Sequence, residues 1–288
     1  MSNGPEQAGD WTVVRMLEWA TGFFRSREIS SPRLSIEWLL AHVLGVRRLD
    51  LYLQFDRPLT TGELDRLRPL VRRRAAHEPL QYITGSTDFY NLTLRVEPGV
   101  LIPRPETEQL VERMLSDHPG EDGLNLLDVG TGSGCIALAV KKERPGWQVT
   151  AIDISAEALR IAGRNAMENN LDVRFAEADF SSWQPPEKQH IIISNPPYIP
   201  EDEMSGLTPE VAGFEPVEAL TAPDIHVVYQ DLLQLCRNHL RPGGRFYFEI
   251  NESHGDKLLF LCNKTPFTCR LEKDYSGKDR FLVGKLEE

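Results

Sequence analysis

The segment Asn195-Pro196-Pro197-Tyr198 combines residue types that can hold a flat NH₂ group. It follows an apolar run, Ile191–Ser194, that is typical of a strand. Proline lacks an amide hydrogen and fixes its own φ angle, so this loop should be rigid, with carbonyl oxygens free to face a ligand. The Asn195 side-chain oxygen and the Pro196 main-chain oxygen could each accept one N–H of a planar NH₂ group, while Tyr198 lies over that group.

An amide or exocyclic amine nitrogen is a poor nucleophile because its lone pair is delocalised. Hydrogen bonds from its two N–H groups to fixed acceptors would orient the nitrogen and make the lone pair available, mostly through positioning and preorganised dipoles. We therefore predict that Asn195, Pro196 and Tyr198 are catalytic, and that the whole segment with Pro197 binds the substrate. A stiff strand-to-loop turn is the alternative interpretation of the two prolines.

A second predicted strand, Leu124–Val129, ends in the glycine-rich turn Gly130-Thr131-Gly132-Ser133-Gly134. Glycines there allow a tight turn and a close approach of the backbone to a ligand. The spacing is GxGxG rather than the GxGxxG of dinucleotide-binding enzymes, and glycines are also common in ordinary turns. We predict that these five residues contact a bound cofactor.

Two aspartates follow the next two predicted strands. Asp153 can accept hydrogen bonds from both hydroxyls of a ribose, and Asp179 from the amino group of an adenine while Phe180 packs on the ring. Each aspartate alone would also suit a helix cap or a turn. Three such features at consecutive strand ends favour a nucleoside site, because ligands in these sheets bind at the carboxyl ends of the strands. The sequence lacks a GxxxxGK(S/T) phosphate loop, so the nucleoside should carry no phosphate, and S-adenosyl-L-methionine fits.

The elements that must position these residues fall into two regions. Residues 11–80 have helical periodicity and predict about four helices, with Ser31-Pro32 and Thr61 as helix starts. Tyr82–Gly85 and Leu92–Val96 alternate like strands and predict a β-hairpin. From about residue 106, strands and helices alternate, which predicts a parallel sheet with helices on both faces. We therefore expect a helical domain over 1–80, a hairpin linker over 81–105 and an α/β domain over 106–288.

Charge and hydropathy exclude several classes of protein. Residues 1–90 hold 12 basic and 11 acidic residues, whereas the rest of the 288-residue chain holds 20 and 32. An acidic catalytic half argues against binding to duplex nucleic acid. The sequence has no run of about 20 apolar residues, and Met1–Asp10 lacks the basic start and apolar run of a secretory signal. We expect a cytoplasmic protein that does not bind membranes and is a monomer.

The four cysteines are Cys135, Cys236, Cys262 and Cys269. They form no CxxC pair, and no histidine stands beside them at the spacing of a metal site. We expect four buried or half-buried thiols, as in a reducing compartment, and no metal.

The chain resembles the PrmC (HemK) glutamine N5-methyltransferases. The motifs that carry the resemblance occur in a fixed order over about residues 11–285. They are His77–Gly85, Arg104-Pro105-Glu106-Thr107-Glu108, Asp128–Ala139, Ser194–Ile199, Phe214-Glu215-Pro216, Ala219-Leu220, Pro242-Gly243-Gly244 and Tyr275–Phe281.

The resemblance implies a seven-stranded, Rossmann-like class I methyltransferase domain behind a small N-terminal helical docking domain. It implies methyl transfer from S-adenosyl-L-methionine to the glutamine of the Gly-Gly-Gln motif in peptide chain release factors. By position it implies cofactor contacts at Gly130, Thr131, Gly132, Gly134, Asp153, Phe180 and Asn195, and it places Arg104 and Glu106 beside the substrate. One departure is visible, since the family often has glycine where this chain has Asn251, which puts a left-handed turn there in doubt.

Three other functions compete with this interpretation. An adenine-N6 methyltransferase of nucleic acid would use the same Asn195 motif, but it would have to extrude its base and bind phosphates. A glutamine methyltransferase of a ribosomal protein shares the motif, although the segment from Arg104 to Glu108 favours release factors. A non-catalytic nucleoside-binding protein would not need the intact motif. The stretch from Arg47 to Arg74 has eight arginines and four acids, and is either a docking surface for release factors or a solvated helix face.

Overall fold

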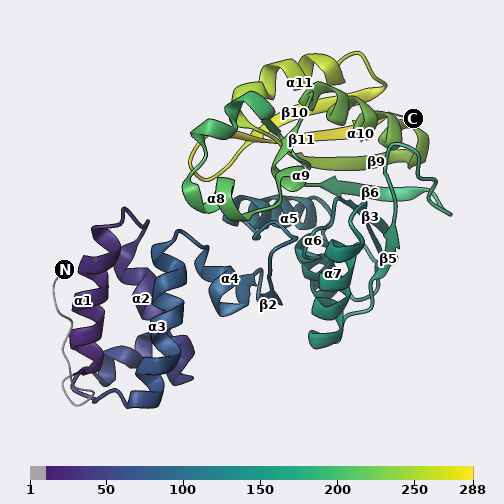
Figure 1. Cartoon of the computed structure of the whole chain (residues 1–288). Coiled ribbons are helices and arrows are strands. Elements are labelled where there is room, and N and C mark those ends of the chain that lie inside the picture. Colours follow the sequence, from purple (N-terminus) through teal and green to yellow (C-terminus); the bar gives the residue numbers. More distant parts are fainter. Residues whose placement is uncertain (1–10, 288) are drawn as a thin grey trace. The chain divides into compact units, whose positions relative to one another are not determined.

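The computed structural model describes residues 11–287 (Figure 1). The chain divides into two compact units. The first comprises Met1–Gly85 and Thr208–Phe214, and the second comprises Ser86–Leu207 and Glu215–Glu288. A short segment late in the sequence, Thr208–Phe214, therefore belongs to the N-terminal unit, although no pattern in the sequence predicts this.

Two observations bear on the expected location of the protein. The polar segment Met1–Asp10, on which part of that expectation was based, lies outside the described residues. Across residues 11–287, every helix falls short of the length or the apolar character that a membrane span needs.

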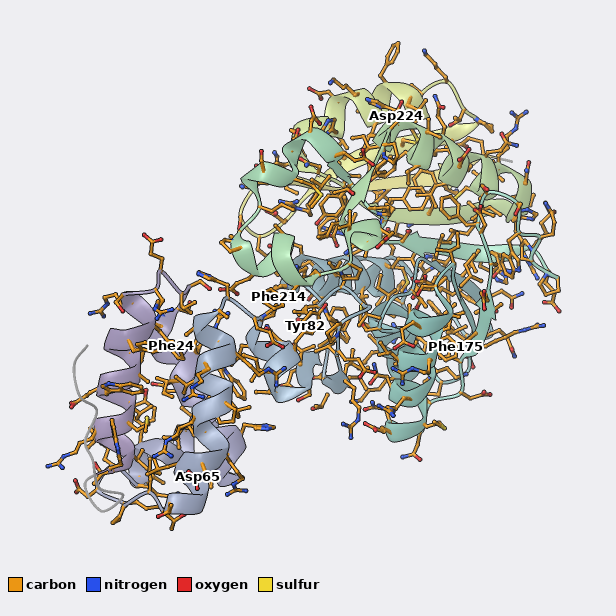
Figure 2. The ribbon with its side chains drawn as sticks, in the orientation of Figure 1. Phe24, Asp65, Tyr82, Phe175, Phe214 and Asp224 are labelled. Atoms are coloured by element: carbon orange, nitrogen blue, oxygen red, sulfur yellow. A yellow bond between two sulfur atoms is a disulfide. The ribbon has the colours of Figure 1, made fainter. Side chains whose placement is uncertain are left out.

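The first unit contains a bundle of helices whose apolar stripes face one another. Helix α1 (Val13–Arg25) buries Leu17, Ala20 and Phe24 at the three- and four-residue spacing that predicted it. The Phe24 side chain lies inside the bundle (Figure 2) and is fully buried. The other elements of this unit are α2 (Pro32–Leu44), η2 (Arg48–Leu53), α3 (Thr61–Ala75), α4 (Leu80–Thr84) and α8 (Pro209–Phe214).

Two local predictions in this unit are wrong. Helix α3 is capped by Thr60 rather than Thr61, because Thr60 and Glu63 form a reciprocal capping box that needs an acid three residues after the cap. The segment Tyr82–Gly85, predicted as a strand, forms the end of helix α4. Tyr82 and Ile83 are consecutive buried residues, which a strand with one exposed face does not allow, and Gly85 ends the helix at a φ of 78°.

The basic stretch from Arg47 to Arg74 is largely occupied by ion pairs. Six of its eight arginines contact carboxylates of the same unit, in the pairs Arg47–Asp50, Arg48–Glu37, Arg57–Glu63, Arg68–Asp65, Arg73–Glu78 and Arg74–Glu210. Within residues 11–287, Arg66 and Arg72 have no such partner and are exposed. The stretch is therefore a much smaller basic surface than its net charge indicated.

The second unit is built on a seven-stranded sheet with the order β10-β11-β9-β6-β3-β4-β5. The five strands from β9 to β5 are parallel, whereas β11 runs antiparallel to both of its neighbours. The expected parallel sheet is thus mixed, because only a short turn joins β10 to β11 and such a turn allows only antiparallel pairing. The strands are β3 (Asn125–Val129), β4 (Gln148–Asp153), β5 (Arg174–Glu177), β6 (Gln189–Ser194), β9 (Leu240–Glu249), β10 (Phe267–Lys273) and β11 (Asp279–Leu286).

Helices cover both faces of this sheet, as predicted (Figure 1). On β6, Ile191 and Ile193 pack toward one face, while Ile192 packs toward the other. Both faces are therefore apolar, which explains why the central strands read as continuous apolar runs. Helices α5 (Pro105–Asp117), α6 (Cys135–Glu143) and α7 (Ala156–Glu168) lie on the first face, and α10 (Ile225–His239) and α11 (Gly255–Cys262) on the second.

Short elements complete the second unit. The hairpin of β1 (Ser86–Phe89) and β2 (Leu92–Arg95) precedes the sheet. The backbone at Asn251 is extended, with φ −71° and ψ 131°, and its side chain accepts a hydrogen bond from the Ser253 amide, so no left-handed turn is required there. The remaining elements, which the sequence did not predict, are β7 (Ile199–Pro200), η3 (Glu201–Gly206), α9 (Val217–Leu220), β8 (Thr221–Ala222) and η4 (Glu252–His254).

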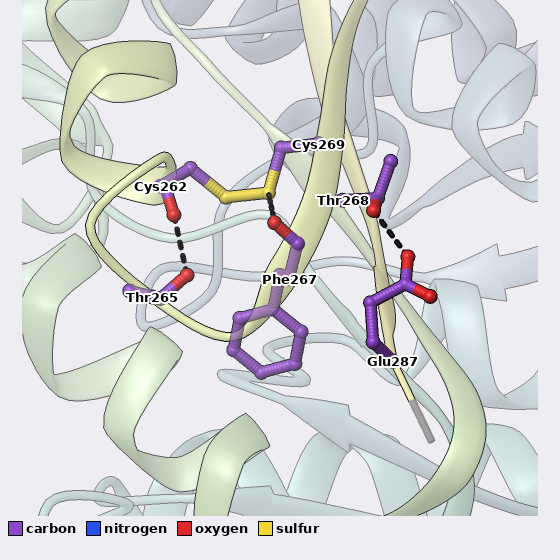
Figure 3. Close-up of a disulfide and its surroundings, with 6 residues drawn as sticks. All are labelled: Cys262, Thr265, Phe267, Thr268, Cys269 and Glu287. Carbon is purple, nitrogen blue, oxygen red and sulfur yellow. Dashed lines mark hydrogen bonds between the residues drawn. A yellow bond between two sulfur atoms is a disulfide. The ribbon is translucent and has the colours of Figure 1, made fainter.

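Two of the four cysteines form a disulfide, so the prediction of four thiols is wrong (Figure 3). Cys262 ends helix α11 and Cys269 lies on β10, with their Cα atoms 6.4 Å apart, within the usual range for a disulfide. They stand seven positions apart in the sequence, a spacing that matches no known cysteine motif. Cys135 and Cys236 are free.

A charged cluster surrounds one buried carboxylate of the helical bundle. The carboxylate of Glu37, whose side chain is 3% exposed, accepts hydrogen bonds from Arg33 at 2.8 Å, Arg48 at 2.7 Å and the Tyr52 hydroxyl at 2.6 Å. Burial by itself would raise the pKa of Glu37, but these three hydrogen bonds outweigh it and lower the pKa. Its ionised form therefore stabilises the fold at neutral pH.

We expect Glu37→Gln to lower the free energy of unfolding by about 2 kcal/mol at pH 7, because it leaves two arginines without their shared anion. Since the pKa of Glu37 is lower in the folded state, its contribution is present above the unfolded pKa and is lost as the pH falls. The difference between variant and wild type should therefore shrink below about pH 4. Urea denaturation at several pH values measures this, with the exposed Glu18→Gln as the control. A constant difference across pH would contradict it.

Candidate active site

A cavity of about 430 Å³ lies at the carboxyl ends of the parallel strands. The register pairs Val129 at the end of β3 with Ile152 on β4 and Ser194 on β6, so the three strands end side by side. The residues that follow these strand ends line the cavity. This is the position at which sheets of this kind bind ligands.

The glycine-rich turn connects β3 to α6 along one wall of the cavity. Gly130, Gly132 and Gly134 have φ angles of 70°, 56° and 83°, which favour glycine over other residues. At Gly134 a Cβ atom would also approach the Ala162 Cβ to 3.1 Å, so this glycine allows α6 to pack closely against α7. Gly134 is buried and does not line the cavity, whereas the four residues before it do.

Asp128, the last residue but one of β3, holds this turn in place. Its Oδ2 accepts hydrogen bonds from the Thr131 hydroxyl at 2.6 Å and from the Ala137 amide at 3.2 Å. The carboxyl is fully buried, and burial raises its pKa to about 7. Asp128 belongs to the motif Asp128–Ala139, but its role could not be predicted from the sequence, because its contacts are internal to the turn.

Asp153 and Asp179 both line the cavity. Asp153 Oδ2 accepts a hydrogen bond from the Gly132 amide at 2.8 Å, and its Oδ1 accepts one from the Ser155 amide at 2.9 Å. Asp179 is exposed and accepts one from the Ser181 amide at 2.9 Å. Each aspartate thus orders its own turn, and each carboxylate oxygen retains a lone pair for a ligand. Phe180 is half-buried beside Asp179 and also lines the cavity.

The Asn195 side chain lies on the cavity wall with its two ends in different environments. Its Nδ2 donates a hydrogen bond to Thr107 Oγ1 at 3.0 Å. Its Oδ1 is buried and has no hydrogen-bond partner within the described part of the chain. A buried carbonyl without a partner costs free energy, so this oxygen is a site at which a ligand N–H would be favoured.

The buried side chains of Thr107 and Glu249 follow Asn195 in a chain of hydrogen bonds. The Thr107 hydroxyl donates to Glu249 Oε2 at 2.7 Å, and the Tyr198 hydroxyl donates to Glu249 Oε1 at 3.1 Å. Burial raises the pKa of Glu249 to about 7. Burial and the neighbouring Glu249 raise the pKa of Tyr198, which keeps its hydroxyl protonated as a donor.

The predicted site residues are therefore brought together only in part. Those that line the cavity are Gly130, Thr131, Gly132, Ser133, Asp153, Asp179, Phe180, Asn195 and Pro197. Those that do not are Gly134, Pro196, Tyr198, Arg104 and Glu106. Residues that the prediction missed include Thr107, Cys135 and the loop residues Gly99, Val100, Pro216 and Ala219. Thr107 could have been suspected, since it lies within the motif that runs from Arg104 to Glu108.

Arg104 does not line the cavity but forms an ion pair with Glu215. Its guanidinium lies 2.5 Å from Oε1 of Glu215, which is buried. Glu215 Oε2 also accepts a hydrogen bond from the Ile102 amide at 3.2 Å. This cluster joins the loop around Pro103 to the loop around Pro216, and both loops line the cavity.

Comparisons with known proteins agree with this geometry. The PrmC N-terminal domain matches residues 15–85, and the methyltransferase small domain matches residues 105–208. A solved methyltransferase structure from Pyrococcus furiosus has a TM-score of 0.52 at 21% identity, covering 68% of this chain and 90% of that one. The likeness confirms the class I methyltransferase fold.

Two relatives align with this chain over almost their whole length. A release factor glutamine methyltransferase from Chlorobaculum tepidum is 41% identical over 283 residues, covering 94% of this chain and 96% of that protein. One from Geobacter sulfurreducens is 37% identical over 278 residues, covering 96% and 97%. The chain belongs to the release factor glutamine methyltransferase family.

Proposed function

We propose that this protein transfers a methyl group from S-adenosyl-L-methionine to the side-chain amide nitrogen of a glutamine. The substrate is the glutamine of the Gly-Gly-Gln motif in peptide chain release factors. The observation that carries the proposal is Asn195, a residue of the cavity wall whose buried Oδ1 has no partner among residues 11–287. It is an acceptor that a planar NH₂ group would satisfy.

The residues present fit the cofactor. The cavity, of about 430 Å³, has the size of a small-molecule site. Asp153 is held by two main-chain amides and can accept the hydroxyls of a ribose, while Asp179 and Phe180 would take the adenine. The turn from Gly130 to Ser133 would lie against the rest of the nucleoside and the amino acid part.

Methyl transfer depends mainly on the orientation of the glutamine nitrogen toward the methyl group. When bound, the cofactor supplies a methyl group on a positively charged sulfur, and the sulfur–carbon bond breaks as the nitrogen–carbon bond forms. Asn195 Oδ1 and the Pro196 carbonyl would each accept one N–H of the glutamine, which aligns its nitrogen without a base. Tyr198 would lie over the planar amide. The alkylated amide is a strong acid and loses its extra proton to water.

The domain roles follow from the same proposal. We assign residues 1–80 to release-factor docking, 81–105 to a linker and 106–288 to methyl transfer. Arg66 and Arg72, the exposed arginines of the basic stretch without a carboxylate partner in residues 11–287, are the cationic groups that remain for an acidic partner. We also propose that the protein acts in the cytoplasm as a monomer. These two assignments derive from the sequence, and the Cys262–Cys269 disulfide is unusual for that compartment.

The decisive experiment incubates the protein with tritiated S-adenosyl-L-methionine and purified release factor. We expect label on the wild-type Gly-Gly-Gln protein and none on a Gly-Gly-Ala version. Asn195→Ala should reduce turnover by about 10³-fold, because the amide loses an acceptor made for the transition state, while cofactor affinity stays within a few-fold. Label on Gly-Gly-Ala, on a ribosomal protein or on DNA instead would replace the proposed substrate.

Asp153→Ala should weaken binding of S-adenosylhomocysteine by about 1–3 kcal/mol, the cost of leaving buried polar groups unpaired. Isothermal calorimetry measures this directly. Asp172→Ala, an exposed acid in the same unit, serves as the control and should bind as the wild type does. An unchanged affinity in Asp153→Ala would mean that the ribose lies elsewhere.

The double variant Arg66→Glu/Arg72→Glu should raise the KM for intact release factor about tenfold, since rim charges mainly affect association. Its affinity for S-adenosylhomocysteine should not change. The matched control reverses two exposed arginines of the second unit, Arg164 and Arg174. Equal KM values in the two double variants would show that the basic stretch does not contribute to docking.

A further inference from the structure

A chain of hydrogen bonds links the cavity to a buried carboxyl. It runs from Asn195 Nδ2 to Thr107 Oγ1 at 3.0 Å and from the Thr107 hydroxyl to Glu249 Oε2 at 2.7 Å. Thr107 lies on α5 and Glu249 at the end of β9, and they are 1% exposed. Neither residue has a part in the proposed methyl transfer described so far.

We propose that Thr107 and Glu249 are positioning residues that fix which end of the Asn195 side-chain amide faces the cavity. The inference rests on the proposed function, because it explains how the acceptor for the glutamine NH₂ is kept in place. It assigns these two residues no contact with the substrate.

The number of available hydrogens decides the direction of this hydrogen-bond chain. A carboxylate accepts hydrogen bonds and cannot donate, so Glu249 forces the single hydroxyl hydrogen of Thr107 to point toward it. The Thr107 oxygen then presents only lone pairs to Asn195. Those lone pairs attract the Asn195 NH₂ and repel its carbonyl oxygen. The oxygen is thereby kept at the opposite end of the amide, where it is a buried acceptor without a partner in residues 11–287.

A reversed amide would be unfavourable on both sides. The Asn195 oxygen would face the Thr107 oxygen with no hydrogen between them. The Asn195 NH₂ would face the cavity, where it would oppose the NH₂ of a glutamine, donor against donor. Asparagine alone has no preference between these orientations, so the direction must come from its neighbours.

Glu249 is itself held by groups from several elements. The Tyr198 hydroxyl donates to its Oε1 at 3.1 Å, and the Tyr229 hydroxyl on α10 donates to its main-chain carbonyl at 2.7 Å. Arg280 on β11 favours the carboxylate, while Glu106 on α5 opposes it. Burial outweighs these contacts and raises the pKa of Glu249 to about 7.

Protonation of Glu249 would remove the fixed donor-to-acceptor direction of the hydrogen bonds from Asn195 through Thr107 to Glu249. A neutral carboxyl carries an O–H that can donate to Thr107, which frees the Thr107 hydrogen to point at Asn195. The reversed amide would then be permitted. Turnover should therefore rise with pH as Glu249 ionises, with a midpoint near pH 7 in the free enzyme.

The experiment compares Thr107→Val, which keeps the shape but removes the hydroxyl, with Thr107→Ser, which keeps the hydroxyl. We expect Thr107→Val to lower kcat by about 10- to 100-fold, and Thr107→Ser to stay within about threefold of the wild type. Affinity for S-adenosylhomocysteine should be unchanged in both variants, which also shows that they fold. The residual turnover of Thr107→Val should lack the rise near pH 7.

Two further variants separate the carboxylate from its surroundings. Glu249→Gln, whose amide can donate to Thr107, should lower kcat as Thr107→Val does. Tyr229→Phe removes a hydrogen bond to the Glu249 main chain without touching the side-chain contacts, and should keep kcat within about threefold. Wild-type turnover in Thr107→Val or Glu249→Gln, equal losses in Thr107→Val and Thr107→Ser, or an unchanged pH profile in Thr107→Val would each overturn the proposal.

A measurement that needs no methylation keeps this test separate from the proposed function. The side-chain NH₂ of Asn195 can be followed by ¹⁵N NMR, with its signal assigned by its absence in Asn195→Asp. We expect its hydrogen exchange to be slow in the wild type and Thr107→Ser, and at least about tenfold faster in Thr107→Val, where the hydrogen bond is absent. Equal exchange rates would overturn the role of Thr107 even if release factors proved not to be the substrate.

Discussion

The parallel pairing of β3 with β4 and β6 is the constraint on which the rest of the site depends. Because these strands are parallel and in register, their carboxyl ends lie side by side. The residues after Val129, Ile152 and Ser194 therefore reach the same end of the sheet. The backbone groups there are no longer used in the ladder and are free to order turns. Gly130 and Thr131, for example, both donate to the Ile152 carbonyl. The cavity is a consequence of how this sheet ends.

Much of the fold could be predicted because its signals are local. Apolar runs of the central strands and the three- and four-residue periodicity of the helices are properties of short segments, and they located most of the elements. The wrong predictions concern segments whose structure is decided by tertiary contacts. The segment Tyr82–Gly85 alternates like a strand, yet it is helical because Tyr82 and Ile83 are both buried. Cys262 and Cys269 meet because α11 returns beside β10, which spacing alone does not reveal.

The same distinction applies to the site. The turn after β3 and Asn195 directly follow strand ends, and Asp153 ends β4, so knowing that the strands are parallel is enough to bring them together. Thr107 and Glu249 are 142 residues apart, and their contact depends on how α5 lies against the sheet near the end of β9. No pattern in the sequence encodes that distance. Arg104 and Glu106 belong to the same motif as Thr107 but do not line the cavity, and their contact with the substrate stays a prediction.

The order of the strands leaves two edges, β10 and β5, whose backbone groups could pair with another molecule. Both carry charges along their length. On β10, Arg270 pairs with Glu272 of the same strand and Lys273 pairs with Asp279 of β11. Strand β5 is only four residues long and has the exposed residues Arg174 and Glu177 at its ends. A second sheet that paired with either edge would have to remove water from these charged groups, so aggregation through β-strand addition is disfavoured.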